Sequence, residues 1–254
     1  MLLKDWETLP DNMRTDDVKK HYDVLKKKTF SLLMIRIFDI VVSLILLILL
    51  SPLFFIISVM IVLDSKGGVF FRQTRVTQFG KEFKIFKFRT MVANAEQIGS
   101  QVTTHNDMRI TRVGKIIRKT RLDEIPQLIN IFLGDMTFVG TRPEVIKYVD
   151  CYTDEMRATL LLPAGVTSKA SIEYKDEDAL MSDCTNVDET YVSVVLPSKM
   201  QYNLENVTHI SLFYNVSILV RTFFAVLTKE KVPQSAPEAI PVDLLNIKEE
   251  TRVS

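Results

Sequence analysis

The stretch "IVVSLILLILLSPLFFIISVMIVL", residues 40–63, decides how this chain folds. It carries no charged residue and is long enough for one helix to cross a lipid bilayer. Pro52 lies near its middle, where proline removes a backbone hydrogen bond and clashes with the preceding turn, so we expect a kink there. Two arrangements remain open: a kinked helix that spans the membrane, or a helix that bends at Ser51-Pro52 and returns to the side it entered. Length alone favours the spanning helix, because kinked spanning helices are common.

Basic residues flank this stretch on both sides. Positive charge is retained on the cytoplasmic side of a membrane, so a spanning helix would have to export one of the two basic groups. A re-entrant helix keeps both groups inside, and the Ser51 hydroxyl could bond a backbone carbonyl freed at the bend. Arg36 and Asp39 lie one helical turn apart and are predicted to pair with each other. The flanking cations are Lys26, Lys27, Lys28 and Arg36 before the stretch, and Lys66, Arg72 and Arg75 after it.

Composition excludes several classes of protein. The 254 residues suffice for one ordinary domain with additions, and a net charge of +1 creates no overall field that would attract nucleic acid or anionic lipid. The two cysteines, Cys151 and Cys184, are far apart and form no CxxC motif, which fits a reducing compartment and argues against a disulfide framework or a zinc site. The three histidines are scattered, and no glycine-rich phosphate loop is present.

The segment after the apolar stretch, "VFFRQTRVTQFGKEFKIFKFRTM" (69–91), alternates apolar and polar residues and predicts a β-hairpin. Period two places Lys87 and Arg89 on one strand face, and Phe86 and Phe88 on the other. Two cations on one face would suit an anionic ligand. A solvated strand face explains the same pattern and is the favoured interpretation when this segment is considered alone.

Two adjacent acids, Asp123 and Glu124, stand within "KTRLDEIPQLINIFLGDMTFVGTRPE" (119–144). Apolar residues recur at helical spacing over 122–132, so this part is predicted to be a helix. Asp123 would be its N-cap, with Pro126 tolerated in the first turn. The simplest interpretation of the acid pair is therefore a capping aspartate and a glutamate that complements the helix dipole.

The surroundings of the acid pair suggest chemistry as well. Arg118, Arg121 and Arg142 flank the predicted helix start, and helix N-termini attract phosphate groups. An aspartate held by amides and arginines stays ionised, so Asp123 could attack a phosphorus atom whose charge is neutralised. Glu124 could hold a magnesium ion that supplies part of that neutralisation.

The remaining segments are less informative. Residues 1–29 form a polar N-terminal extension, expected to be helical or partly disordered. Residues 161–174 contain a Pro-Gly loop that leads into a predicted strand or extended segment, and residues 178–200 are expected to be partly helical. The apolar stripe of 207–228 fits either a core helix or a helix lying on a membrane surface. Residues 233–254 are polar and rich in proline, and are predicted to be a flexible tail.

Five features in order resemble the bacterial sugar transferase family, the monotopic phosphoglycosyl transferases, over about residues 30–232. The resemblance implies an α+β, mostly helical fold with a small β-hairpin. It also implies a membrane-embedded re-entrant helix over 30–66, broken at Ser51-Pro52, which replaces the spanning helix favoured above. Residues 67–232 then form a catalytic domain with cytosolic catalytic helices and amphipathic interfacial helices. The five features are Ser51-Pro52, "FKIFKFRTM", "TRLDEIPQLINIFLGDM", "FVGTRPE" and "LFYNVSILVRTFFAVL".

The resemblance also implies a mechanism. Family members use an Asp-Glu dyad, which falls on Asp123 and Glu124 of this chain. Asp123 would attack the β-phosphate of a UDP-sugar, expel UMP and form a covalent phosphosugar-aspartyl intermediate, which polyprenyl (undecaprenyl) phosphate then attacks. Glu124, together with Asp123, would bind the cofactor Mg²⁺.

Four cations are implied to bind phosphate or substrate: Lys87, Arg118 and Arg142 match family cations, and Arg89 lies on the same strand face as Lys87. The chain departs from the family pattern at two places. Thr141 stands where the family usually has proline, which predicts altered loop rigidity. "SKAS" (168–171) replaces the usual "GLAQ", so contacts of that loop with sugar or nucleotide are not carried over.

The implied partners are a UDP-sugar, polyprenyl phosphate, membrane lipids and downstream glycosyltransferases, with no nucleic acid. The implied location is the cytoplasmic face of a bacterial inner membrane, at the first membrane step of exopolysaccharide, capsule, O-antigen or glycoprotein glycan assembly. A different class of function stays open beside this one. A non-catalytic membrane-anchored scaffold, with its basic hairpin on anionic lipid, explains the anchor and the cations but not the acids beside the arginines.

Overall fold

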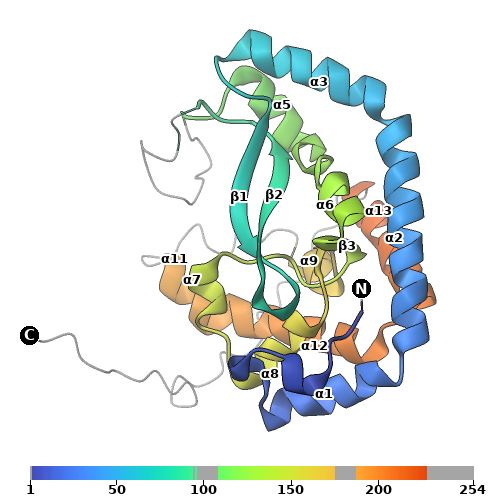
Figure 1. Cartoon of the computed structure of the whole chain (residues 1–254). Coiled ribbons are helices and arrows are strands. Elements are labelled where there is room, and N and C mark those ends of the chain that lie inside the picture. Colours follow the sequence, from blue (N-terminus) through green and yellow to red (C-terminus); the bar gives the residue numbers. More distant parts are fainter. Residues whose placement is uncertain (1, 94, 96–107, 175–186, 228–254) are drawn as a thin grey trace, which may run out of the picture.

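The structure is a computed structural model that describes residues 2–93, 95, 108–174 and 187–227 (Figure 1). The predicted tail at 233–254 and residues 178–186 of the partly helical segment lie outside these residues. The predicted α+β, mostly helical composition is confirmed. The longer helices are α1 (Asp16–Lys26), α2 (Thr29–Leu49), α3 (Ser51–Asp64), α5 (Arg112–Lys119), α6 (Gln127–Leu133), α12 (Leu196–His209) and α13 (Leu212–Leu227).

Helices α2 and α3 meet at a sharp bend, so that α2 runs along one side of the molecule and α3 crosses its end (Figure 1). The break predicted at Ser51-Pro52 is confirmed: α2 ends at Leu49 and α3 begins at Ser51. The Ser51 hydroxyl donates to the carbonyl of Ile48 at 2.8 Å, as expected for a bend that frees backbone acceptors. Among the described helices, α2 alone has the length and apolar composition needed to cross a membrane.

Only one stripe of α2 and α3 is buried. Leu32, Ile35 and Ser43 of α2 face the protein, as do Ile57 and Ile61 of α3. Most other apolar side chains of both helices point outward, and such a large continuous apolar surface is typical of contact with lipid or with a partner. The most exposed of these residues are Phe30, Ile45, Ile48, Leu49, Phe55, Ile56, Val62 and Leu63.

The two charged residues of α2 fix it to the rest of the chain. Arg36 donates to the carbonyls of Ile131 (2.6 Å) and Phe132 (2.9 Å) at the C-terminal end of α6. Asp39 is buried and accepts a hydrogen bond from the backbone N–H of Phe138 at 3.3 Å. The two side chains, predicted to pair with each other, thus bond separate backbone groups of α6 and β3, which lie within their reach.

The predicted β-hairpin is confirmed. Strands β1 (Phe70–Val76) and β2 (Glu82–Phe88) pair antiparallel, with Phe70 opposite Phe88 and Val76 opposite Glu82. The turn between them uses Gly80 in the left-handed region, at φ 72°. Alternate residues of β2 pack inward, since Phe83 and Ile85 join a core cluster with α6 and β3.

A second, parallel pair of short strands lies beside the hairpin: β3 (Met136–Val139) and β4 (Ala164–Thr167). The strand predicted within 161–174 is present as β4, but it includes Gly165 of the expected loop, and residues 169–173 after it are helical and not extended. The motif pattern gave no sign of β3. Gly140 and Gly165 touch where the chain leaves β3, and a Cβ on Gly165 would come within 2.1 Å of the Gly140 nitrogen. Glycine is therefore required at this crossing, from which the "TRPE" loop departs.

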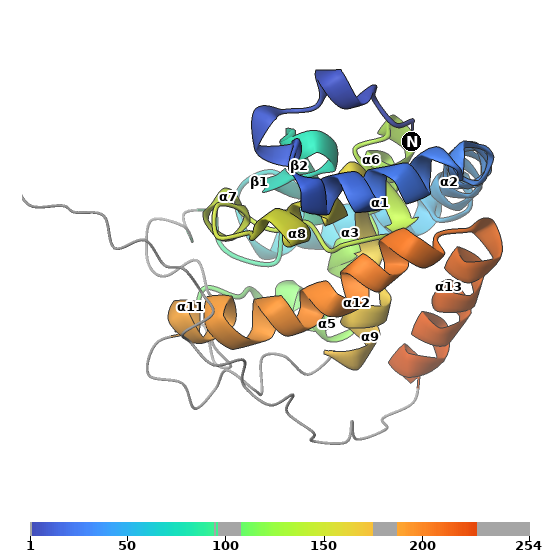
Figure 2. The same ribbon diagram turned by 90° about the horizontal axis from the view of Figure 1, so that it is seen from below.

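The N-terminal extension is folded and belongs to the main hydrophobic core. It contains α1, whose N-cap Thr15 accepts a hydrogen bond from the Val18 N–H. Helix α1 packs against α8 (Asp154–Arg157) and α12, and Figure 2 shows it beside both helices. The side chains that the extension buries in the core are Leu9, Met13, Val18, Tyr22 and Leu25.

The segment 207–228 is two helices, not one. Helix α12 ends at His209 and α13 begins at Leu212, and Lys28 donates to the carbonyls of Thr208 and Ile210 at this break. Helix α13 buries Asn215 and Ile218 and turns its apolar stripe outward. A core helix is therefore the wrong interpretation of that stripe, and its contact with a membrane surface stays a prediction. The exposed residues of the stripe are Phe213, Val216, Val220, Phe223 and Phe224.

Candidate active site

The acid pair lies on a single 3-10 turn, Leu122–Glu124, and not in the first turn of an α-helix. The prediction that Asp123 is the N-cap is wrong: α6 begins at Gln127, with Pro126 as its N-cap. The cause is local. The backbone bonds here are of the 3-10 type, with the N–H of Ile125 donating to the carbonyl of Leu122 and that of Leu128 to the carbonyl of Ile125, so no α-helical turn forms over the acids.

Backbone strain precedes the acid pair. Arg121 adopts the left-handed conformation, with φ 56° and ψ 19°. For a residue other than glycine this conformation costs about 1 kcal/mol of conformational free energy, and such outliers concentrate at functional sites. The turn at Arg121 separates the end of α5 from the acids, which therefore lie on a short connection between two helices.

Glu124 is held by two cations that come from different parts of the fold. Lys87, on β2, donates to Glu124 Oε1 at 2.8 Å, and Arg142, in the loop after β3, donates to the same oxygen at 2.7 Å. The Glu124 side chain is only 16% exposed. Burial alone would raise the pKa of Glu124, but the charges and hydrogen bonds of Arg142 and Lys87 outweigh it and hold that pKa far below its ordinary value.

Asp123 shows the opposite behaviour. Burial and the neighbouring charge of Glu124 raise the pKa of Asp123 above its usual value, while the charges of Lys87 and Arg118 oppose that rise. Amides and arginines were expected to keep Asp123 ionised. Its pKa is nevertheless raised, because Lys87 and Arg142 direct their hydrogen bonds to Glu124. Two adjacent carboxylates with divergent pKa values are typical of sites in which each group has its own chemical role.

Arg118 and Arg89 occupy different positions. Arg118, in the last turn of α5, is close enough for its charge to act on Asp123. Arg89 is buried and lies away from the acids. It donates to the carbonyls of Ser65 (2.7 Å) and Lys66 (2.8 Å), at the C-terminal end of α3. Sharing a strand face with Lys87 thus does not bring Arg89 to the acid pair, because its long side chain reaches the neighbouring helix end.

The loop of Arg142 rests on residues that the sequence did not single out. Arg75, considered above only as a basic flank, donates to the Pro143 carbonyl at 3.2 Å and to Gln73 Oε1 at 2.7 Å. Burial lowers the pKa of the Arg75 guanidinium. The available signal was the pair Gln73 and Arg75, two polar residues on one face of β1.

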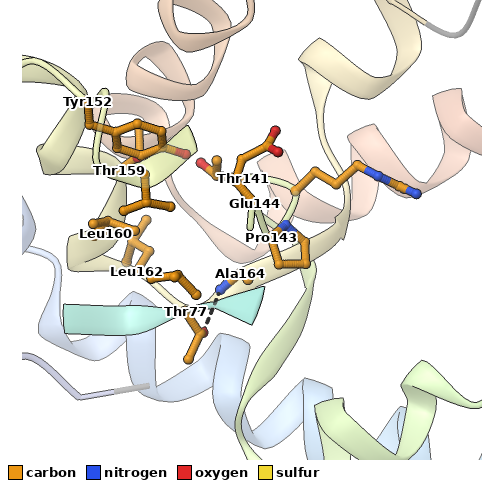
Figure 3. A pocket seen from close by; sticks show the side chains of 12 residues that line it. Thr77, Thr141, Pro143, Glu144, Tyr152, Thr159, Leu160, Leu162 and Ala164 are labelled. Carbon is orange, nitrogen blue, oxygen red and sulfur yellow. Dashed lines mark hydrogen bonds between the residues drawn. The ribbon is translucent and has the colours of Figure 1, made fainter. Parts of the chain in front are cut away.

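A small pocket lies behind this loop (Figure 3). Figure 3 shows Pro143 and Glu144 on one side of it, with Tyr152 and Leu160 on the other. Its free volume, about 10 Å³, holds at most one water molecule. A nucleotide does not fit there, so the pocket belongs to the support of the loop and not to substrate binding.

The second departure from the family pattern, residues 168–171, forms the start of the short helix α9 (Lys169–Glu173). Ser168 caps this helix by accepting a hydrogen bond from the Ser171 N–H, and Lys169 pairs with Glu205 of α12 at 2.7 Å. These side chains are therefore engaged in local structure and in packing α9 against α12.

The acid pair also has the chemistry of a partial magnesium site. Mg²⁺ prefers oxygen ligands, and enzymes commonly bind it through one or two carboxylates while substrate phosphates and water complete the shell. Asp123 and Glu124 supply such carboxylates. Across the described residues, no group of three or more His, Cys, Asp and Glu side chains could hold a metal ion. The donor set therefore fits an ion that is bound together with a phosphate substrate.

Comparison with known proteins places the chain in a family. The model of the bacterial sugar transferase family matches residues 30–229. The chain is 35% identical, over 75% of its length, to a UDP-N-acetylgalactosamine-undecaprenyl-phosphate N-acetylgalactosaminephosphotransferase of Aeromonas hydrophila, and covers 43% of that protein. It is 32% identical, over 73% of its length, to the UDP-glucose:undecaprenyl-phosphate glucose-1-phosphate transferase of Escherichia coli K12, of which it covers 38%.

This chain covers a larger share of a third, shorter relative. The putative undecaprenyl-phosphate N-acetylgalactosaminyl 1-phosphate transferase of Bacillus subtilis is 39% identical over 54% of this chain, which covers 76% of that protein. The chain spans less than half the length of the first two relatives. The region that matches the family model, residues 30–229, contains the acid pair and its cations. This chain therefore belongs to the bacterial sugar transferase family.

Proposed function

We propose that this protein is a phosphoglycosyl transferase that moves a sugar-1-phosphate from a UDP-sugar to polyprenyl phosphate and releases UMP. The observation that carries the proposal is the acid pair itself. Glu124 accepts hydrogen bonds from Lys87 and Arg142, while its neighbour Asp123 has a raised pKa. The relatives named above, which carry undecaprenyl-phosphate sugar phosphotransferase names, support the same reaction class.

The reaction takes place in two displacements at one phosphorus atom. A carboxylate oxygen of Asp123 attacks the β-phosphorus of the UDP-sugar, and the bond from that phosphorus to the bridging oxygen breaks, so that UMP leaves. A phosphate oxygen of the polyprenyl phosphate then attacks the same phosphorus and releases the Asp123 carboxylate. Desolvation raises the basicity of Asp123, which favours it as the nucleophile once it is ionised.

The cations stabilise charge on the phosphates. Lys87 and Arg142 meet at one oxygen of Glu124, and both side chains are long enough to exchange that oxygen for a phosphate oxygen. Arg118 faces Asp123 from the end of α5 and adds positive charge on that side. Glu124, with Asp123, would hold Mg²⁺, which neutralises part of the diphosphate charge when it is bound.

The α2–α3 pair is proposed to be the re-entrant membrane element. Its bend at Ser51, its outward apolar surface and the basic residues on both flanks support entry and exit on the cytoplasmic face of a bacterial inner membrane. Helix α13 would lie on the same membrane surface through its exposed stripe. In this position the acid pair can receive a lipid-linked phosphate from the membrane and a nucleotide sugar from the cytoplasm, and pass its product to downstream glycosyltransferases.

The reaction is tested by UMP release. The purified protein in undecaprenyl phosphate, detergent and Mg²⁺ is given a panel of UDP-sugars, since the relatives name N-acetylgalactosamine and glucose as sugars. We expect one donor to release UMP, and donor alone to add the mass of a sugar phosphate to Asp123. A scaffold protein would release no UMP with any donor, and an adduct on another residue would contradict the role of Asp123.

The membrane placement is tested separately by labelling. Single cysteines are introduced before Phe30 and after Leu63 in a variant that lacks Cys151 and Cys184, and are probed with an impermeant maleimide in intact and inverted vesicles. A re-entrant α2–α3 pair exposes both sites on the cytoplasmic side. Labelling of the two sites on opposite sides would support a helix that spans the membrane instead.

A further inference from the structure

The "TRPE" loop, residues 141–144, carries Arg142 to the acid pair, and its backbone is fixed on both sides. Its first residue follows the contact between Gly140 and Gly165, where the chain cannot shift without a clash. Strand β1 supports its last two residues. The hydrogen bonds are Gly165 N–H to Thr141 O at 2.8 Å, Arg75 Nη1 to Pro143 O at 3.2 Å, and Val76 N–H to Glu144 O at 3.0 Å.

The last side chain of the loop enters a buried polar network. Glu144 Oε1 accepts a hydrogen bond from the Tyr191 hydroxyl at 2.5 Å, and Lys199 Nζ donates to that hydroxyl at 3.1 Å. Lys199 Nζ also lies 3.8 Å from Glu144 Oε1. All three side chains are buried, with Glu144 and Lys199 each 8% exposed. The network thus joins the loop to the π-helical turn Tyr191–Val195 and to α12.

A network of this kind specifies geometry more than it adds stability. The attraction within a buried ion pair little more than offsets the free-energy cost of removing its charges from water. Loss of one member, by contrast, leaves a buried charge without compensation. Its contribution therefore lies in fixing one arrangement of the groups that it joins. Here that group is Glu144, which is separated from Arg142 only by Pro143.

We propose that Glu144, Tyr191 and Lys199 are positioning residues that hold the Arg142 loop, and thereby set the direction from which the Arg142 guanidinium reaches Glu124 and the substrate phosphate. The inference rests on the proposed function, because Arg142 must contact phosphate for its direction to matter.

The test is a double-mutant cycle on UMP release at saturating UDP-sugar. Tyr191→Phe removes one hydroxyl and keeps the ring that packs against Tyr148. We expect kcat to fall about tenfold to a hundredfold, since small displacements of a positioned group have effects of this size. In the background of Arg142→Ala, the same Tyr191→Phe change should alter kcat by less than about twofold, because the group that it positions is gone.

Tyr148→Phe is the matched control. It removes a hydroxyl bonded to a carboxylate in the same part of the fold, Tyr148 to Asp188 at 2.7 Å, but that carboxylate does not belong to the Arg142 loop. We expect its thermal midpoint to fall about as much as that of Tyr191→Phe, with kcat unchanged. Glu144→Gln is a second variant for the same cycle, and it keeps the shape of the side chain if Tyr191→Phe does not fold.

The outcomes separate this inference from the proposed function. If the effects of Tyr191→Phe and Arg142→Ala on kcat multiply, or if Tyr148→Phe lowers kcat equally, the network is structural only and the inference is overturned while the transferase stands. If the wild-type protein releases no UMP from any donor, or if Arg142→Ala keeps full activity, the proposed chemistry at Arg142 fails and the inference fails with it.

Discussion

Two neighbouring cations, Lys87 and Arg89, serve two different regions of the molecule. Lys87 donates to a carboxylate, Glu124, on the turn that carries the acid pair. Arg89 donates to backbone carbonyls at the end of α3, where that helix leads into the hairpin. A carbonyl at a helix end must keep its partner for the fold to hold, whereas a carboxylate can yield its cation to an incoming phosphate. The acceptor, and not the cation, distinguishes the catalytic region from the structural one.

The largest expected effect is at the nucleophile. Asp123→Asn should lower the rate of UMP release by at least about three orders of magnitude, because loss of a covalent nucleophile removes the reaction path. Since burial raises the pKa of Asp123, the neutral amide removes a charge that the site disfavours at neutral pH, and the thermal midpoint should not fall. Radiolabelled donor measures the residual rate, and substantial turnover by a verified Asp123→Asn sample would contradict the assignment.

The next largest effect is expected at Lys87, the cation that bonds the acid pair. Lys87→Met keeps the length of the side chain and removes its charge, so we expect kcat/KM for the UDP-sugar to fall about a hundredfold or more. Stability should change little, because Arg142 still bonds Glu124. Steady-state kinetics and thermal unfolding of the same preparation measure both quantities, and an unfolded or fully active variant would contradict the prediction.

Arg89→Met is the structural counterpart of the same substitution. It leaves the carbonyls of Ser65 and Lys66 without their charged donor, so we expect the free energy of unfolding to fall by about 2 kcal/mol. The effect on kcat of the folded fraction should be far smaller than that of Lys87→Met. Denaturant unfolding and active-site titration measure the two. A hundredfold loss of kcat at full stability would place Arg89 in substrate binding, as the sequence implied.

The smallest expected effect is a change in pH dependence. The charge of Glu124 helps to raise the pKa of Asp123, so activity should fall on acidification at a higher pH than for an ordinary aspartate. In Glu124→Gln that charge is gone, and Lys87 and Arg142 are released toward Asp123, so the acid limb of the residual activity should move to lower pH. The pH dependence of the rate of burst UMP formation measures this shift in both proteins. An acid limb that moves to higher pH in Glu124→Gln would show that the charge of Glu124 does not raise the pKa of Asp123.

The features that local chemistry determines were predictable from the sequence. The break at Ser51-Pro52 follows from proline, and the hairpin follows from the alternation of residues around Gly80. The 3-10 turn at Asp123 was not predicted, because the helical spacing of apolar residues over 122–132 fits an α-helix with Pro126 in its first turn equally well.

The features that were missed depend on contacts distant in the sequence. Strand β3 is identified only by its pairing with β4, and the core role of the N-terminal extension only by the helices that it covers. The destination of Arg89 depends on where α3 ends in space, and Arg75 gains its role from the Pro143 carbonyl. The motif residues Lys87 and Arg142 were correctly associated with the acids because a family resemblance already contains such long-range information.

The hydrogen bonds that join α2 to α6 and β3 have a mechanical consequence. Arg36 holds the end of α6 and Asp39 holds β3, so α2 cannot tilt without carrying both elements along. The acid pair precedes α6 and the Arg142 loop follows β3, so both parts of the candidate site move together with α2. In the proposed membrane placement, the depth of α2 in the bilayer therefore sets how far the acid pair lies from the lipid surface.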